Sequence, residues 1–212
     1  MALALAGGML APNLNLAQAA PSYVADPASW VDPIVGTSNG GNTFPGAVLP
    51  QGMLSFSPDQ AAYAGPTSGT YAGLGYLTSA SPSAYLYSRT YIRGFSLTHI
   101  NGPGCTGANG DVPIFPMPGV LTQAPTAAEH NAPVRSTFSH ANEHAEAGYY
   151  QVALDNGVNT ELSATYRTGT ARFTFPTSDT QGTVLVRSAE SMVGSTDADV
   201  QIDPATQTVS GS

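Results

Sequence analysis

The sequence predicts an all-β protein, folded as an antiparallel β-sandwich. Nearly every periodic segment alternates apolar and polar residues with a period of two, as strands with one buried face do. Glycine and proline, 23 and 17 of the 212 residues, stand between these segments, and no stretch has the spacing of a long amphipathic helix. With 42% hydrophobic residues, the chain can bury one sandwich core.

The strongest strand pattern lies in the second half of the chain. Tyr150, Val152 and Leu154 fall on one face of a predicted strand. Asp155-Asn156-Gly157 follows and predicts a type I′ hairpin turn before a strand over 158–166. Further strands are expected around Ala171, Phe173 and Phe175 and over 184–187 and 200–209.

The first nineteen residues are predicted to be a signal peptide, in a form that is truncated at its start. They are small and apolar, and Ala17-Gln18-Ala19 has the A-x-A form of a cleavage site, although no Lys or Arg stands near the start. Pro12, Asn13 and Asn15 interrupt the stretch, which argues against a transmembrane helix. The sequence therefore predicts a protein that is secreted, extracellular or periplasmic.

Charge and cysteine content narrow the classes of partner. Only 9% of the residues are charged, the net charge is −8, and all six basic residues are arginines. Because the chain has no basic patch that could neutralise phosphates or anionic lipids, neither nucleic acid nor a membrane surface is expected as a partner. The single cysteine, Cys105, cannot form an internal disulfide; it is either a small buried hydrophobe or a thiol shielded by a partner domain.

Two glycine-rich stretches are the candidates for a ligand site. The first, 31–59, contains Gly36, Gly40, Gly41 and Gly46; the second, 94–116, contains His99, Cys105 and Asp111. Glycine tolerates positive φ and lets a backbone approach a ligand closely. An ordinary strand connection with a hydrogen-bonded histidine is the alternative interpretation.

Four motifs, taken in order, resemble one known family. They are VDPIVGTSNGGNTFPGAVLPQGMLSFSPD, GFSLTHINGPGCTGANGDVPIFP, FSHANEHAEAGYYQVAL and TYRTGTARFTFP. Together they are similar to the N-terminal region of glycoside hydrolase family 92, the secreted calcium-dependent exo-α-mannosidases. The resemblance covers about Trp30 to the C-terminus. It implies a supersandwich-like domain over 30–212 that is incomplete at its C-terminal end.

The resemblance also implies where the chemistry lies. In the family the general acid, the general base and the calcium ligands belong to a helical barrel domain that follows the β domain and is absent from this chain. We therefore expect no catalytic residue and no metal ligand here, calcium only in the full-length enzyme, and no activity of this fragment alone. The expected partners are mannose-containing glycans and the C-terminal helical catalytic domain.

If similar to the family, the two glycine loops face the barrel and complete the subsite for the terminal mannose by shape and hydrogen bonding. The expected substrate-binding residues are Gly40, Gly41, Phe44, His99, Gly104, Cys105 and Asp111. A stand-alone carbohydrate-binding module without catalysis is the alternative function, and a purely structural sandwich is a third.

Other features have competing interpretations. HANEH, 140–144, matches the H-x-x-E-H zinc pattern, which requires a helix, but a strand is predicted to begin only a few residues later. The resemblance to the family explains the segment instead as a connecting motif. Tyrosines in 59–88 could stack on sugars or, more commonly, pack a loop. Trp30 is expected to anchor the core. Carboxylates that could form a hydrolytic pair are Asp59, Asp111, Glu143, Glu146 and Glu190.

Overall fold

A computed structural model describes residues 22–60, 83–100, 110–122, 134–188 and 197–212. One short 3-10 helix, η1 (Pro27–Trp30), precedes a succession of strands. The first five strands are β1 (Ala47–Val48), β2 (Ser55–Asp59), β3 (Tyr91–Ile92), β4 (Gly94–Ser96) and β5 (Ile114–Pro118). The rest are β6 (Ser136–Glu146), β7 (Tyr149–Leu154), β8 (Asn159–Ala164), β9 (Gly169–Thr174), β10 (Gly182–Val186), β11 (Val200–Asp203) and β12 (Thr208–Gly211).

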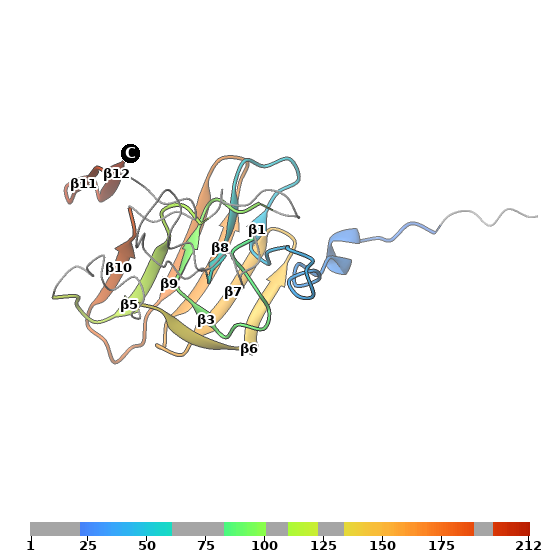
Figure 1. Cartoon of the computed structure of the whole chain (residues 1–212), viewed down its shortest axis with the longest axis horizontal. Coiled ribbons are helices and arrows are strands. Elements are labelled where there is room, and N and C mark those ends of the chain that lie inside the picture. Colours follow the sequence, from blue (N-terminus) through green and yellow to red (C-terminus); the bar gives the residue numbers. More distant parts are fainter. Residues whose placement is uncertain (1–21, 61–82, 101–109, 123–133, 189–196) are drawn as a thin grey trace, which may run out of the picture.

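The strands form two five-stranded sheets and a separate hairpin (Figure 1). One sheet has the order β1-β2-β4-β5-β10 and the other the order β3-β6-β7-β8-β9. Every paired strand that the structure describes is antiparallel. The predicted all-β fold with antiparallel sheets is thus confirmed, and the hairpin β11–β12 stands apart from both sheets (Figure 1).

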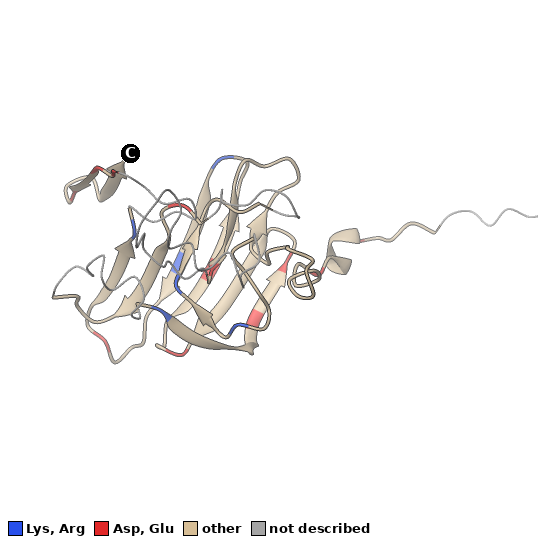
Figure 2. Ribbon diagram, in the orientation of Figure 1, with Lys and Arg blue, Asp and Glu red and all other residues tan. Residues whose placement is uncertain are grey.

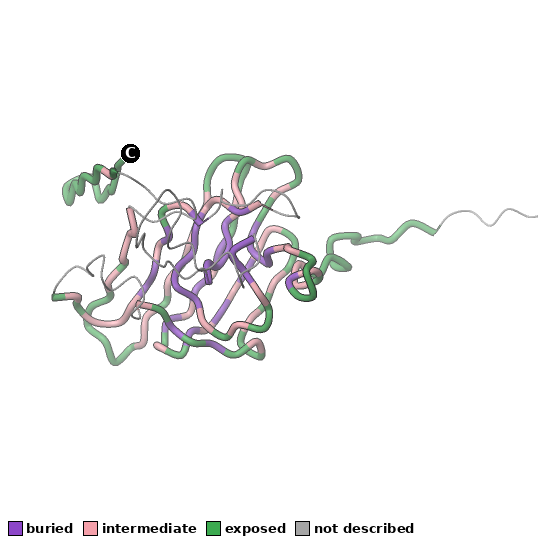
Figure 3. Tube along the Cα trace, viewed as in Figure 1, coloured by how far each residue is buried: buried purple, intermediate pink, exposed green. Residues whose placement is uncertain are grey.

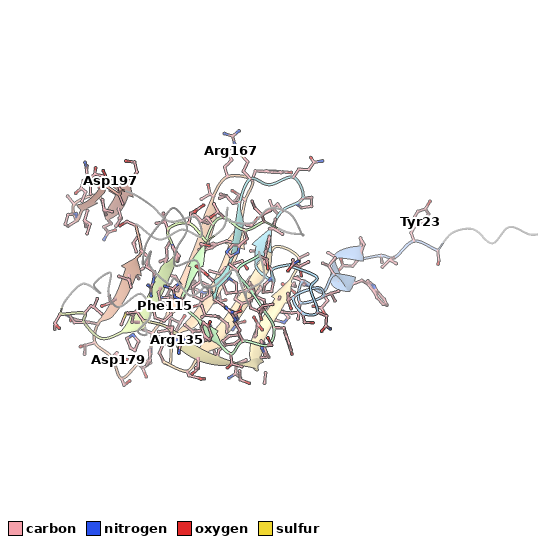
Figure 4. The ribbon with its side chains drawn as sticks, in the orientation of Figure 1. Tyr23, Phe115, Arg135, Arg167, Asp179 and Asp197 are labelled. Atoms are coloured by element: carbon pink, nitrogen blue, oxygen red, sulfur yellow. The ribbon has the colours of Figure 1, made fainter. Side chains whose placement is uncertain are left out.

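The core lies between the two sheets and follows from the alternation along each strand. Phe56, Phe95 and Phe115 enter it from the first sheet, and strand β7 contributes Tyr150, Val152 and Leu154, as predicted. Phe115 lies inside the body of the molecule in Figure 4. Figure 3 shows the buried tube concentrated in the central strands, whereas β11–β12 and the N-terminal segment are exposed.

The turn between β7 and β8 confirms the predicted hairpin but not the predicted turn type. Gly157 has a φ of 90°, and its N–H donates to the carbonyl of Leu154 at 2.9 Å. Positive φ in this turn is confined to Gly157, whereas a type I′ turn needs it at both central residues. Asn156 avoids it because its own N–H donates to Ser136 Oγ at 3.0 Å and its side-chain amide donates to the Pro116 carbonyl at 3.1 Å. The loop therefore has three residues with glycine last.

The HANEH segment is strand, not helix. Residues 136–146 form β6, and its pairing with β7 shifts register between Phe138 and Glu143. His140 packs inward against Phe138, with ring centroids 5.0 Å apart, while the side chain of His144 is 61% exposed. Because His140 and His144 lie on a strand, they do not share one face of a helix, and the zinc-peptidase interpretation is wrong.

The prediction that Trp30 anchors the core is wrong. Trp30 is 80% exposed and ends η1, a single turn whose N-cap Asp26 accepts the N–H of Ala28 at 3.2 Å. This segment belongs to neither sheet and extends away from the sandwich, as the labelled Tyr23 shows (Figures 1 and 4). Within the described residues, no helix has the length and apolar character that crossing a membrane requires.

Candidate functional site

The first glycine loop is a tight, left-handed fold of backbone before β1. Gly36 and Gly40 have φ values of 87° and 79°. Gly41 lies so close to Gly36 that a Cβ built on it would meet the Gly36 carbonyl oxygen at 2.2 Å. Thr43 closes the loop by donating its N–H to Gly36 at 3.3 Å and its hydroxyl to the Val35 carbonyl at 2.9 Å. Glycine at 41 is required by space, and glycine at 36 and 40 by backbone conformation.

The second glycine loop leaves β4 and returns to β5 through a neck held by Thr98. The Thr98 hydroxyl donates to Asp111 Oδ2 at 2.9 Å and accepts the Asp111 N–H at 3.0 Å. The Thr98 carbonyl accepts the N–H of Gly110 at 2.8 Å. Residues 101–109 lie outside the described residues, so the neck is the part of this loop that the structure defines.

The two loops meet at an aromatic contact. The rings of Phe44 and His99 are 5.3 Å apart between centroids, and both side chains are buried, at 7% and 6% exposure. Ser83 joins them: its hydroxyl donates to the Thr43 carbonyl at 2.8 Å, and its carbonyl lies 2.9 Å from His99 Nδ1. Phe44 of the first glycine-rich stretch and His99 of the second, distant in sequence, thus pack together inside the fold.

His99 is held as a neutral imidazole. Because Nδ1 faces the Ser83 carbonyl, it carries the hydrogen, and Nε2 accepts the hydroxyl proton of Ser96 at 2.8 Å. Burial lowers the pKa of His99 to about 4, a change only partly opposed by the hydrogen bond to Ser83 and the charge of Asp111. A serine next to a histidine is a nucleophilic pair in other contexts, but here Ser96 is 1% exposed. The pair fixes the position of the loop neck.

The predicted substrate-binding residues occupy different positions around this contact. Gly40 and Gly41 are exposed, Asp111 is half-buried, and Phe44 and His99 are buried. Among the described residues, no neighbouring atom lies within 4 Å of a Cβ built on Gly40. Gly104 and Cys105 lie outside the described residues. Whether these residues contact a sugar stays a prediction.

A buried polar cluster around Glu143 was missed by the sequence analysis as a unit. The Glu143 side chain is 2% exposed and accepts hydroxyl protons from Tyr85 at 2.8 Å and Tyr150 at 2.7 Å. His140 Nδ1 lies 2.7 Å from its other oxygen, and the His140 ring stacks on Tyr87. Burial next to this carboxylate raises the pKa of Tyr85 and Tyr150. The cluster fastens segment 83–90 to β6 and β7, so Tyr85 packs its loop, the interpretation the sequence favoured.

The carboxylates considered for hydrolysis have dissimilar surroundings. Asp59 is fully buried in β2, Glu146 is 61% exposed, and Glu190 lies outside the described residues. Among the residues that the structure describes, no three His, Cys, Asp or Glu side chains gather in a group that could hold a metal ion. Figure 2 shows acidic and basic residues distributed over the described fold.

Comparison with known proteins decides the family. Residues 30–212 match the model of the glycosyl hydrolase family 92 N-terminal domain. The chain belongs to glycosyl hydrolase family 92. A family 92 α-mannosidase from Bacteroides thetaiotaomicron superposes with a TM-score of 0.55 at 34% identity, covering 70% of this chain and 18% of that one. The family 92 glycosyl hydrolase ccman5 superposes with a TM-score of 0.65 at 28% identity over 84% of this chain and 22% of that one.

A curated relative is also similar to this chain over most of its length. A protein of Arthroderma benhamiae described as an uncharacterized secreted glycosidase is 28% identical over 171 residues, which is 79% of this chain and 20% of that protein. The chain therefore spans about a fifth of the length of the relatives it matches. It corresponds to their N-terminal β domain.

Proposed function

We propose that this chain is the N-terminal β domain of a secreted, calcium-dependent α-mannosidase. In this proposal it completes, from one side, the subsite that holds the terminal mannose of an α-mannoside. The general acid and base belong to the helical catalytic domain that the relatives' greater length accommodates. The β domain supplies shape and hydrogen bonds and moves no proton.

The observation that carries the proposal is the packing of the two family motifs against each other. Phe44 of the first motif lies against His99 of the second, and His99 follows Thr98, whose hydroxyl holds Asp111 at the loop neck. Backbone groups of a left-handed glycine loop can approach a sugar ring closely, because no Cβ intervenes. The half-buried Asp111 carboxylate adds an acceptor of the kind that sugar hydroxyls bind.

Among the described residues of this domain, no three His, Cys, Asp or Glu side chains gather in a group that could hold a metal ion, and calcium takes six to eight oxygen ligands. We propose that the calcium of the complete enzyme is bound by the catalytic domain. Removing calcium with a chelator is then expected to stop mannose release without changing the thermal unfolding of the β domain.

A matched pair of glycine substitutions tests the site. Gly40 and Gly119 both have a φ of 79°, and a Cβ on either meets no atom of the described residues within 4 Å. Gly40→Ala and Gly119→Ala therefore introduce similar backbone strain, of about 1–2 kcal/mol. In the complete enzyme, only Gly40→Ala is expected to lower kcat/KM for α-mannosides, by at least about tenfold, because its methyl group enters the sugar subsite. Equal effects of the two variants would refute the placement of the subsite.

A further inference from the structure

Both ring nitrogens of His140 face hydrogen-bond acceptors. Nε2 lies 2.5 Å from the backbone carbonyl oxygen of Tyr87, and Nδ1 lies 2.7 Å from Glu143 Oε2. A carbonyl oxygen can only accept, so Nε2 carries a hydrogen. Glu143 also accepts the hydroxyl protons of Tyr85 and Tyr150, as an ionised carboxylate does. Nδ1 therefore needs a hydrogen as well, and this arrangement requires His140 in its doubly protonated, positively charged form.

The surroundings of His140 favour a positive charge. Its ring stacks on that of Tyr87 with centroids 3.9 Å apart, and a cation over the face of a tyrosine ring is attracted to it. The Glu143 side chain is 2% exposed, so little water screens the pair. Burial next to this carboxylate raises the pKa of Tyr85 and Tyr150, so both stay neutral donors. His140 is therefore the group of this cluster whose charge changes near neutral pH.

The contact between His140 and Tyr87 is connected to the first glycine loop. The Tyr87 N–H donates to the carbonyl of Thr37 at 3.0 Å. Thr37 directly follows the left-handed Gly36, is 1% exposed and donates its hydroxyl to the Ile34 carbonyl at 2.8 Å. Tyr87 therefore links strand β6, through its carbonyl, to the glycine loop, through its N–H.

Segment 83–87 is strained near its start. Ala84 is 1% exposed and has a φ of 65°, a left-handed conformation that residues other than glycine rarely adopt. Its carbonyl accepts the N–H of Gln60 at 2.9 Å, and the contact with His140 holds the other end of the segment. Strain of this kind persists only while the surroundings over-determine the backbone. Loss of the His140 contact therefore favours opening of the segment.

We propose that His140 is a positioning residue whose proton keeps the first glycine loop in place, so that the loop is held while His140 is charged and released when the proton leaves to solvent. Without that proton, Nδ1 presents a lone pair to the Glu143 carboxylate, and the buried pair acquires an uncompensated negative charge. The consequence for a sugar rests on the proposed function. Gly40 and Gly41 belong to this loop, so its release is expected to raise KM for α-mannosides more than it lowers kcat.

Hydrogen–deuterium exchange of the full-length polypeptide tests the positioning, with protection factors that correct for the intrinsic pH dependence of exchange. In the wild type, protection of 36–43 and 85–89 is expected to fall by at least about tenfold between about pH 5 and about pH 8. His140→Gln is expected to abolish this pH dependence, because glutamine has no charge to lose. The control His144→Gln changes a 61% exposed histidine of the same strand and should keep it. His99 does not interfere, because its pKa of about 4 keeps it neutral in this range.

A second variant, Glu143→Gln, distinguishes the need for a proton from a general loss of structure. An amide at this position can donate to the neutral form of His140 while its oxygen accepts the tyrosine hydroxyls. Glu143→Gln is therefore expected to keep its protection at about pH 8, where the wild type loses it. The control Glu146→Gln changes a 61% exposed carboxylate of the same strand and should behave as the wild type does.

The remaining outcomes overturn the proposal or the function on which its consequence rests. Wild-type protection that does not change with pH, or that changes equally in His140→Gln, overturns the positioning, and so does a loss of protection in Glu143→Gln at about pH 8. A KM for α-mannosides that stays constant while protection falls overturns the link to the sugar site. Protection that depends on pH in an enzyme inactive on mannosides refutes only the proposed function.

Discussion

Two adjacent tyrosines of β7 allow the same substitution to be made on opposite faces of one strand. Tyr150 is fully buried and donates its hydroxyl proton to the buried Glu143 at 2.7 Å, whereas Tyr149 donates to Glu161 near the surface at 2.8 Å. A hydrogen bond to a charged group contributes about 1.5–3 kcal/mol. Tyr150→Phe leaves the buried carboxylate with one hydroxyl donor, Tyr85, next to His140. We expect it to cost about that amount.

Thermal unfolding followed by circular dichroism measures the difference. A loss of about 1.5–3 kcal/mol in a domain of this size lowers Tm by roughly 3–12 °C. Tyr149→Phe is expected to change Tm far less, because water replaces the lost partner at the surface. Equal shifts for the two variants would refute the reasoning that burial of Glu143, rather than the tyrosine hydroxyl as such, makes the contact strong.

Three further predictions concern stability and pH. Because the folded pKa of His99, about 4, lies below its unfolded value of about 6.5, the unfolded chain binds the extra proton between these pH values. Stability should therefore fall as pH decreases through that window, by up to about 3 kcal/mol, and urea titrations of His99→Gln should show a shallower fall. Thr160→Val should leave stability unchanged or raise it by about 1 kcal/mol, again by urea titration, because the fully buried Thr160 hydroxyl has no hydrogen-bond partner in the described structure; a clear loss would contradict this. Tyr85 and Tyr150 have raised pKa values, so their stabilisation is complete below about pH 10 and lost above it. An absorbance titration should show both ionising only as the protein unfolds; ionisation in the folded state would disprove their burial.

The sequence predicted the sheets well where one physical signal dominates. Alternation placed Tyr150, Val152 and Leu154 in the core correctly, because a one-sided strand must repeat every second residue. The same logic failed at the turn after Leu154. Asn-Gly favours type I′ in isolation, but Asn156 forms tertiary hydrogen bonds to Ser136 and Pro116, and those contacts are not visible in a local pattern.

The candidate site was predicted as a set of motifs rather than as a geometry. The glycine spacing indicated close backbone approach, which the contact of Gly41 with Gly36 displays. Nothing in the sequence showed that Phe44 would pack on His99 or that Tyr85 would reach Glu143, because these partners are 55 and 58 residues apart. Trp30 was misjudged because a large aromatic residue is usually buried, and only the position of η1 outside the sheets explains its exposure.

The central claim is that this β domain serves an α-mannosidase. Its most direct test is the release of mannose from α-linked mannosides by the full-length polypeptide, compared with the release of glucose and galactose from the corresponding α-glycosides. The proposal predicts rapid hydrolysis of the mannosides, inhibition by a calcium chelator, and a selective loss in Gly40→Ala. Hydrolysis of another glycoside with no mannose release would contradict it.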